Sequence, residues 1–147
     1  MRSLLLSALV VLWITAPASA ALLESFDTSL AGWRVSGDNE SEWSPNAGNP
    51  GGCIDVNDLA TGARNDAVAP LRFLGDWGAA TPSDVLSFDV FTSLRSGSPS
   101  PGAYTIRISG PGGSATALEG FLPPFDTWTT VSVPLDPASW DVQGDWA

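Results

Sequence analysis

Residues 69–77 read APLRFLGDW and residues 86–90 read LSFDV, and these two segments are the most informative about the fold. In the second segment, Leu86, Phe88 and Val90 alternate with Ser87 and Asp89. Alternation with a period of two is the pattern of a half-buried antiparallel strand. The first segment is an aromatic-rich connection bounded by turn residues. Together they predict a β-sandwich and the register of its central strand, with residues 86, 88 and 90 on one face.

Two further segments show the same period. Residues 104–109 place Tyr104, Ile106 and Ile108 on one face, and residues 130–135 do the same for Val131, Val133 and Leu135. Pro134 inside the last segment predicts an edge strand, or a position where the ladder hydrogen bond is not needed, because proline has no N–H to donate. Weaker strands are expected at residues 22–26, 32–35, 42–44 and 53–56, with turn signals at 37–39, 46–52 and 61–62. The pattern predicts an all-β fold, an antiparallel β-sandwich of jelly-roll type.

The first 20 residues have the three parts of an export leader. Arg2 is followed by an apolar run from Leu4 to Ile14 and then by APASA at residues 16–20. We expect cleavage after Ala20, which leaves residues 21–147 as a single domain. The apolar run is about half of the roughly 20 residues that a membrane span needs, so no span is expected in the processed chain. The leader therefore predicts a secreted or periplasmic protein.

The processed chain is strongly acidic and has one cysteine. The leader contains one of the six basic residues and none of the 16 acidic residues, so residues 21–147 carry a net charge of −11. Such a surface repels nucleic acid and anionic lipid. Cys53 has no partner for an internal disulfide and is expected to be packed in the core.

Five motifs occur in order along the processed chain. They are GNPGG at 48–52, AP and FLGD within 69–76, LSF at 86–88, IRISGPGG at 106–113 and WTTVSVPL at 128–135. The chain thereby resembles a laminin B module, also called laminin IV type A, in its solitary exported bacterial form. The resemblance implies a jelly-roll-like, galactose-binding-like β-sandwich of extracellular proteins, without catalytic activity.

The same resemblance implies further strands after the tryptophan-containing segment. Members of that family continue with another strand and a closing strand, whereas this sequence ends at Trp146 and Ala147. A missing strand would leave a sheet edge and part of an apolar face uncovered. We therefore expect the domain to be incomplete at its C-terminus.

Histidine is absent, which removes the usual general base, the common catalytic triads and the commonest zinc ligand. A pair of carboxylates could in principle hydrolyse a glycoside. The acids available for such a pair are Glu24, Glu40, Glu42, Asp89 and Glu119. Most of them fall at strand positions that face solvent or in turns, which predicts no enzyme activity.

A structural calcium ion is the one cofactor that the sequence suggests. Calcium binds carboxylate and carbonyl oxygens, and loops of an acidic exported sandwich can supply them. Glu24 and Asp27 resemble the N-terminal half of the calcium site of carbohydrate-binding jelly rolls. The partner acid in those proteins comes from the last strand.

Tryptophans at strand ends or in loops are the remaining candidates for ligand contact, because flat rings stack on sugar faces and sandwich rims collect binding residues. These tryptophans are Trp43, Trp77, Trp128, Trp140 and Trp146, whereas Trp33 alternates with Val35 and is expected in the core. Asp76, Trp77 and Trp128 are the preferred ligand-binding residues.

Two functions follow from these observations. The first is an exported, non-enzymatic adhesion or interaction module of the laminin IV type A kind, acting on an extracellular-matrix or cell-surface glycan or protein. The second is a carbohydrate-binding module with a possible structural calcium site. Both exclude nucleic acid as a partner.

Overall fold

The computed structural model of the chain describes residues 2–6, 22–59, 64–74, 77, 80–94 and 103–145. This part of the chain is almost entirely strand, turn and connection. The strands are β1 (Arg2–Leu6), β2 (Arg34–Ser36), β3 (Asn39–Ser44), β4 (Cys53–Asp58), β5 (Asp66–Val68), β6 (Val85–Ser93), β7 (Tyr104–Gly110), β8 (Gly113–Phe121), β9 (Thr129–Pro134) and β10 (Asp141–Gly144). Two short 3-10 turns, η1 (Leu71–Phe73) and η2 (Pro137–Ser139), interrupt them.

One layer is a five-stranded sheet with the order β3-β4-β1-β6-β9. Each pairing of neighbouring strands in it is antiparallel. β9 is an edge strand, as Pro134 predicted. The long strand β6 pairs with β9 from Val85 opposite Pro134 to Val90 opposite Thr129.

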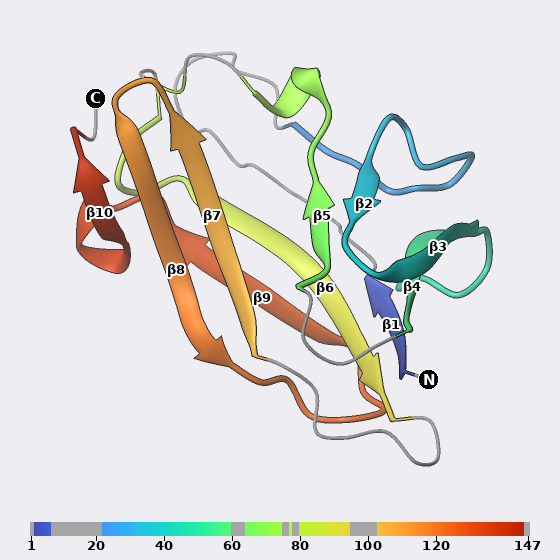
Figure 1. Cartoon of the computed structure of the whole chain (residues 1–147). Coiled ribbons are helices and arrows are strands. Elements are labelled where there is room, and N and C mark those ends of the chain that lie inside the picture. The colour runs from blue at the N-terminus through green and yellow to red at the C-terminus, as the bar shows by residue number, and fades with distance from the viewer. Residues whose placement is uncertain are drawn as a thin grey trace.

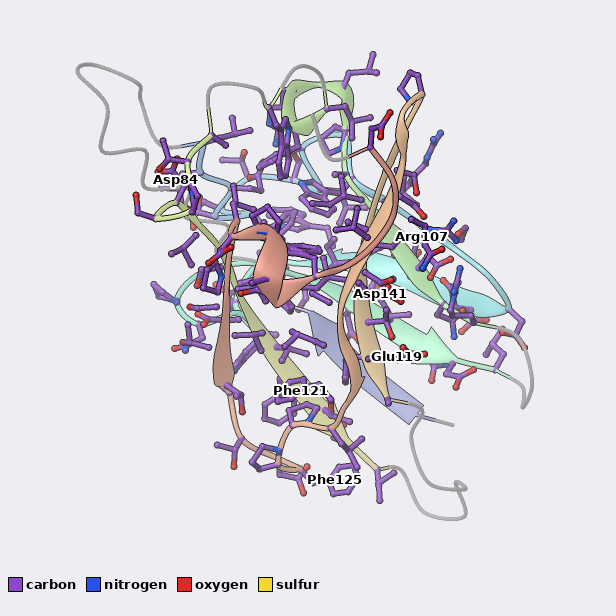
Figure 2. All side chains as sticks on the ribbon, turned by 90° about the vertical axis from the view of Figure 1, so that its left-hand side faces the viewer. Asp84, Arg107, Glu119, Phe121, Phe125 and Asp141 are labelled. Atoms are coloured by element: carbon purple, nitrogen blue, oxygen red, sulfur yellow. The ribbon has the colours of Figure 1, made fainter. Side chains whose placement is uncertain are left out.

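The second layer consists of a three-stranded sheet, β10-β8-β7, and a two-stranded sheet, β2-β5. Figure 1 shows β7 and β8 as a long hairpin that lies across β6 and β9. The outward face of this sheet is polar, with Arg107, Glu119 and Asp141 exposed to solvent (Figure 2). The chain is therefore an all-β protein built as a sandwich of antiparallel sheets.

Two apolar clusters fill the space between the layers. The first contains Phe26, Ile54, Val56 and Phe73, with Trp33 and Val35 packed against it. The second contains Ala115, Ala117, Val133, Leu135 and Trp140. Leu86 of β6 contacts both clusters and joins them. Burying these side chains in two layers is what stabilises a sandwich.

Most of the expected strands are confirmed. Residues 86–90 and 104–109 fall in β6 and β7, residues 130–134 fall in β9 with Leu135 just beyond it, and the weaker segments at 32–35, 42–44 and 53–56 overlap β2, β3 and β4. Trp33 packs in the core, and Cys53 is a fully buried free cysteine, as expected.

The strand expected at residues 22–26 is wrong. No strand is assigned there, and Phe26 adopts a φ of 55°, which lies outside the extended region. The backbone N–H of Phe26 donates to Oε1 of Glu24 over 3.0 Å instead of to a neighbouring strand. The side chain of Glu24 thus takes the place of a sheet partner.

β1 comes from the segment that the sequence assigns to the export leader. It pairs with β4 on one side and with β6 on the other, so it occupies the middle of the five-stranded sheet. Within the described ranges, no helix is both long and apolar enough to cross a membrane. Cleavage after Ala20 stays a prediction.

Candidate functional site

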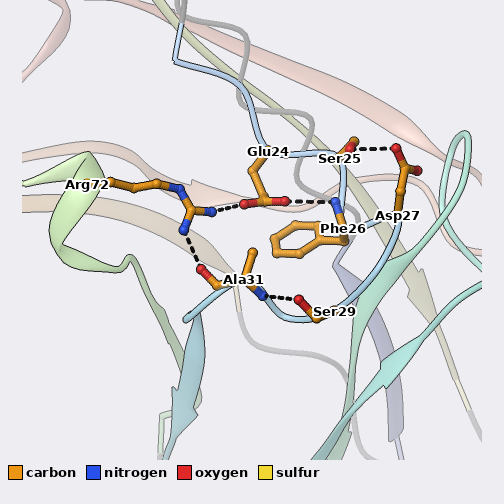
Figure 3. A network of polar contacts seen from close by, with 7 residues as sticks. All are labelled: Glu24, Ser25, Phe26, Asp27, Ser29, Ala31 and Arg72. Atoms are coloured by element: carbon orange, nitrogen blue, oxygen red, sulfur yellow. Dashed lines mark hydrogen bonds and ion pairs between the residues drawn. The ribbon is translucent and has the colours of Figure 1, made fainter.

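An ion pair between Glu24 and Arg72 organises one end of the sandwich (Figure 3). The Glu24 side chain is 11% exposed, and its second oxygen accepts the Phe26 N–H. The guanidinium of Arg72 also donates to the carbonyl of Ala31 and lies 5.0 Å from the centre of the Phe73 ring. These contacts fix η1 against the segment that precedes β2.

A shallow hollow of about 500 Å³ lies beside this ion pair. Apolar residues from the β2 and β5 region and from η1 form most of its lining, which consists of Ala31, Gly32, Arg34, Val68, Ala69, Pro70, Leu71, Arg72 and Leu74. The lining contains two arginines and no acidic residue. Because Arg72 is ion-paired with Glu24, the exposed Arg34 supplies the positive charge of this otherwise apolar surface, on a chain with a net charge of −10.

Leu71 and Leu74 stand out at the rim of the hollow. Leu71 is 84% exposed and Leu74 is 56% exposed, whereas Phe73 between them is buried in the first core cluster. The buried ring and the Arg72 contacts hold the turn in place while both leucines face water. A large exposed apolar side chain on a fixed turn is typical of a contact surface.

The two residues expected to bind calcium have different partners in the structure. Both carboxylate oxygens of Glu24 are engaged, one by Arg72 and one by the Phe26 N–H. Asp27 is exposed and accepts a hydrogen bond of 2.7 Å from the hydroxyl of Ser25. Figure 3 shows the two carboxylates pointing in different directions. No group of three or more His, Cys, Asp or Glu side chains that could hold a metal ion occurs in the described part of the chain.

The two preferred tryptophans lie apart. Trp77 packs against the second core cluster, and its indole N–H donates to the carbonyl of Phe73 over 3.2 Å. Trp128 lies near the far end of β6, where its ring is 5.4 Å from that of Phe91 with a tilt of 45°. The two rings therefore do not form one platform. Asp76 lies outside the described residues.

Two other tryptophans belong to the core. Trp43 packs against the first cluster and donates to the carbonyl of Phe26 over 2.7 Å. Trp140 is 7% exposed and donates to the carbonyl of Pro134 over 2.8 Å. Burial with a satisfied N–H is the ordinary role of a tryptophan in a sandwich. Trp146 lies outside the described residues.

Aromatic residues gather at the end of the sandwich where β6 finishes. Phe121 and Phe125 both lie there in Figure 2, and a bridge between Phe125 and Thr92 brings the connection after β8 beside β6. Phe125 is 37% exposed, and the neighbouring Leu122 and Leu94 are exposed as well. We call this cluster the aromatic end; its aromatic residues are Phe91, Phe121, Phe125 and Trp128.

Asp89 is not a solvent-facing carboxylate as its strand position suggested. It is 4% exposed, and its Oδ1 accepts a hydrogen bond of 2.5 Å from the hydroxyl of Thr130 on β9. Asp89 and Glu24 are thus both buried and bonded within the fold. Among the acids named above, Glu40 and Glu42 on β3 and Glu119 on β8 are exposed.

Burial controls the ionisation of two groups. It raises the pKa of the Cys53 thiol from 9.0 to about 11, with a further increase from the charge of Asp55. It also raises the pKa of Tyr104 to about 12, against a smaller opposing effect of the hydrogen bond to Thr92. Cys53 is therefore protonated at neutral pH and packs as a small apolar residue.

Comparisons with protein-family models, with curated proteins and with solved structures gave no match. The fold and the geometry described above are therefore the basis for assigning a function. The likeness to laminin B modules stays a prediction from the five motifs.

Proposed function

We propose that this chain is an exported, non-enzymatic adhesion or interaction module of the laminin IV type A kind. The exposed leucine pair at η1 carries this proposal. Leu71 and Leu74 project from a turn that the Glu24–Arg72 ion pair and the buried Phe73 ring hold in place. A fixed apolar contact loses little conformational entropy on binding, which favours recognition.

The chemistry of the hollow indicates what the partner presents. The leucines and the apolar lining match an apolar side chain or an apolar sugar face, and the exposed Arg34 favours an acidic group beside it. A matrix or cell-surface protein or glycan with that combination is the proposed partner. The remaining acidic surface repels nucleic acid and anionic membranes.

The proposal is tested with the protein recovered after export from a bacterial host. We expect saturable binding to one or more members of an array of extracellular-matrix proteins and cell-surface glycans. We expect no change in the chain length of polysaccharides incubated with the same preparation. Specific turnover of a polysaccharide would contradict a non-enzymatic module.

A carbohydrate-binding function is the second candidate, and the aromatic end favours it. Trp128 and the exposed Phe125 could stack on a sugar ring, as aromatic residues do in many sugar sites. A glycan array distinguishes the two functions when it is repeated with calcium and with a chelator. Glycan binding that is lost in Trp128→Ala and kept when Leu71 and Leu74 are both changed to Ser would favour this candidate.

A further inference from the structure

The position of β1 defines a slot in the five-stranded sheet, between β4 and β6. β1 pairs with β4 from Arg2 opposite Asp58 to Leu6 opposite Ile54, and with β6 from Ser3 opposite Ser93 to Leu5 opposite Phe91. Both pairings are antiparallel. Residues 2–6 lie in the expected export leader, so cleavage after Ala20 removes the middle strand of the sheet.

An empty slot presents two open strand edges. Without β1, the facing backbone N–H and C=O groups of β4 and β6 lose their partners. The two strands then lie about two strand spacings apart, roughly 9.6 Å, which is too far for direct hydrogen bonds. Open edges of this kind bind extended segments by adding them as a strand.

We propose that the processed chain binds an extended segment of a partner protein in this slot, and that apolar and basic residues alternate in that segment. The proposal rests on the export that the proposed function includes. It does not depend on the hollow beside η1, because no residue of β4 or β6 lines that hollow.

The inner face of the slot requires apolar side chains. Ile54 and Val56 of β4 are fully or almost fully buried in the first core cluster, and Thr92 of β6 is 2% exposed. In the register of β1, residue 4 lies opposite Val56 and Thr92, and residue 6 lies opposite Ile54. A bound segment therefore adds every second residue to the core.

The outer face of the slot favours basic side chains. Asp55 and Asn57 alternate with the buried residues of β4, and Glu42 and Glu40 of β3 lie opposite them. These residues line an open hollow of about 370 Å³. In the register of β1, residues 5 and 3 lie opposite Asp55 and Asn57. Lysine or arginine at those two positions would lie on the same face of the sheet as the carboxylates of Asp55, Glu40 and Glu42.

Asn57 provides a second reason for a donor at this face. Its side-chain oxygen is buried and accepts no hydrogen bond within the described part of the chain. With residue 3 of β1 opposite Asn57, this buried acceptor has no partner among the described residues, and an ammonium or guanidinium group at that position of a bound segment would supply one. The negative charge of the processed chain also speeds encounter with a basic segment.

Fluorescent five-residue peptides test the proposal on the processed chain recovered after export. One peptide carries the sequence of residues 2–6, RSLLL; two others, RKLKL and RELEL, carry Lys or Glu at the outward positions. We expect RKLKL to bind about tenfold more tightly than RELEL. A control peptide, RKPKL, has proline at a ladder position and should not bind. The uncleaved chain, whose own strand fills the slot, should bind none of them.

Two protein variants distinguish peptide binding in the slot from partner binding at the hollow beside η1. Changing both Glu40 and Glu42 to Gln should reduce the preference for RKLKL over RELEL, because it removes two of the carboxylates. Changing both Leu71 and Leu74 to Ser should leave peptide binding unchanged. A failure at the hollow and a failure at the slot are therefore distinguishable. A processed chain that gains its β-sheet circular dichroism signal only with RKLKL would also support the proposal.

Four results would overturn it. The first is an exported chain whose intact mass shows that residues 2–6 are retained. The second is a folded, processed chain that binds no peptide, or binds RKLKL and RELEL equally. The third is a processed dimer that the peptide dissociates, since the slot would then belong to a second copy. The fourth is protection of the β4 and β6 amides from hydrogen exchange in the peptide-free monomer, which would show closure by the chain itself.

Discussion

The guanidinium of Arg72 on η1 is ion-paired with the carboxylate of Glu24, in the segment before β2. This contact joins two parts of the chain that are far apart in sequence and fixes the turn that presents Leu71 and Leu74. The geometry of the candidate interaction surface therefore depends on a buried acid that contacts no partner itself.

Replacing Glu24 with Gln should destabilise the fold. The change removes the charge that pairs with Arg72 and weakens the acceptor for the Phe26 N–H. Because Arg72 is 40% exposed, water recovers part of the loss, and we expect about 1–2 kcal/mol in urea unfolding. Arg64→Gln, in the exposed pair with Asp66, is the matched control and should cost less than about 0.5 kcal/mol. Equal effects of the two changes would contradict a structural role for the buried pair.

Alkaline pH should weaken the fold through Cys53. The folded-state pKa of about 11 lies above the ordinary 9.0, so the folded chain holds the thiol proton more tightly than the unfolded chain. The stabilisation is complete below pH 9 and is lost as the pH rises toward 11, by about 2–3 kcal/mol for a shift of this size. Urea midpoints measured between pH 8 and 11 should fall less steeply for Cys53→Ala. Parallel curves for the two proteins would show that Cys53 does not contribute.

Gly52 and Gly110 should respond very differently to alanine. A Cβ atom at Gly52 would lie 2.0 Å from the carbonyl oxygen of Phe26, whereas Gly110 has no atom within 4 Å of that position. The Phe26 carbonyl is also the acceptor for Trp43, so the neighbouring core would have to move. We expect Gly52→Ala to cost about 3 kcal/mol or more, or to prevent folding, and Gly110→Ala to cost less than about 1 kcal/mol. Comparable thermal melts for both variants would contradict the close approach.

The sequence predicted the strands whose core faces carry large side chains. β6, β7 and β9 alternate Leu, Phe, Val or Ile with polar residues, and all three were identified. β8 was missed because its inward residues include the small Ala115 and Ala117, and Leu118 and Gly120 adopt positive φ values. Such a strand is specified by its neighbours and not by its own residue preferences.

The candidate site was harder to predict than the fold. The segment APLRFLGDW predicted Asp76 and Trp77 as ligand-binding residues. The exposure of Leu71 and Leu74 depends instead on the contacts that Arg72 and Phe73 make with distant residues. Spacing in the sequence gives no information on such contacts. The pairing of Glu24 with Arg72 could not be predicted for the same reason, because the two residues are far apart in sequence.

Binding by a variant that lacks both exposed leucines is the decisive test of the proposed function. The exported protein, the variant with both Leu71 and Leu74 changed to Ser, and a control with Leu59 changed to Ser are applied to the matrix protein or glycan that the native chain binds. Leu59 is an exposed leucine that does not line the hollow. We predict that the double variant loses at least about tenfold in affinity with an unchanged urea midpoint, and that the control binds like the native chain. Native-like binding by the double variant would contradict the claim that this surface contacts the partner.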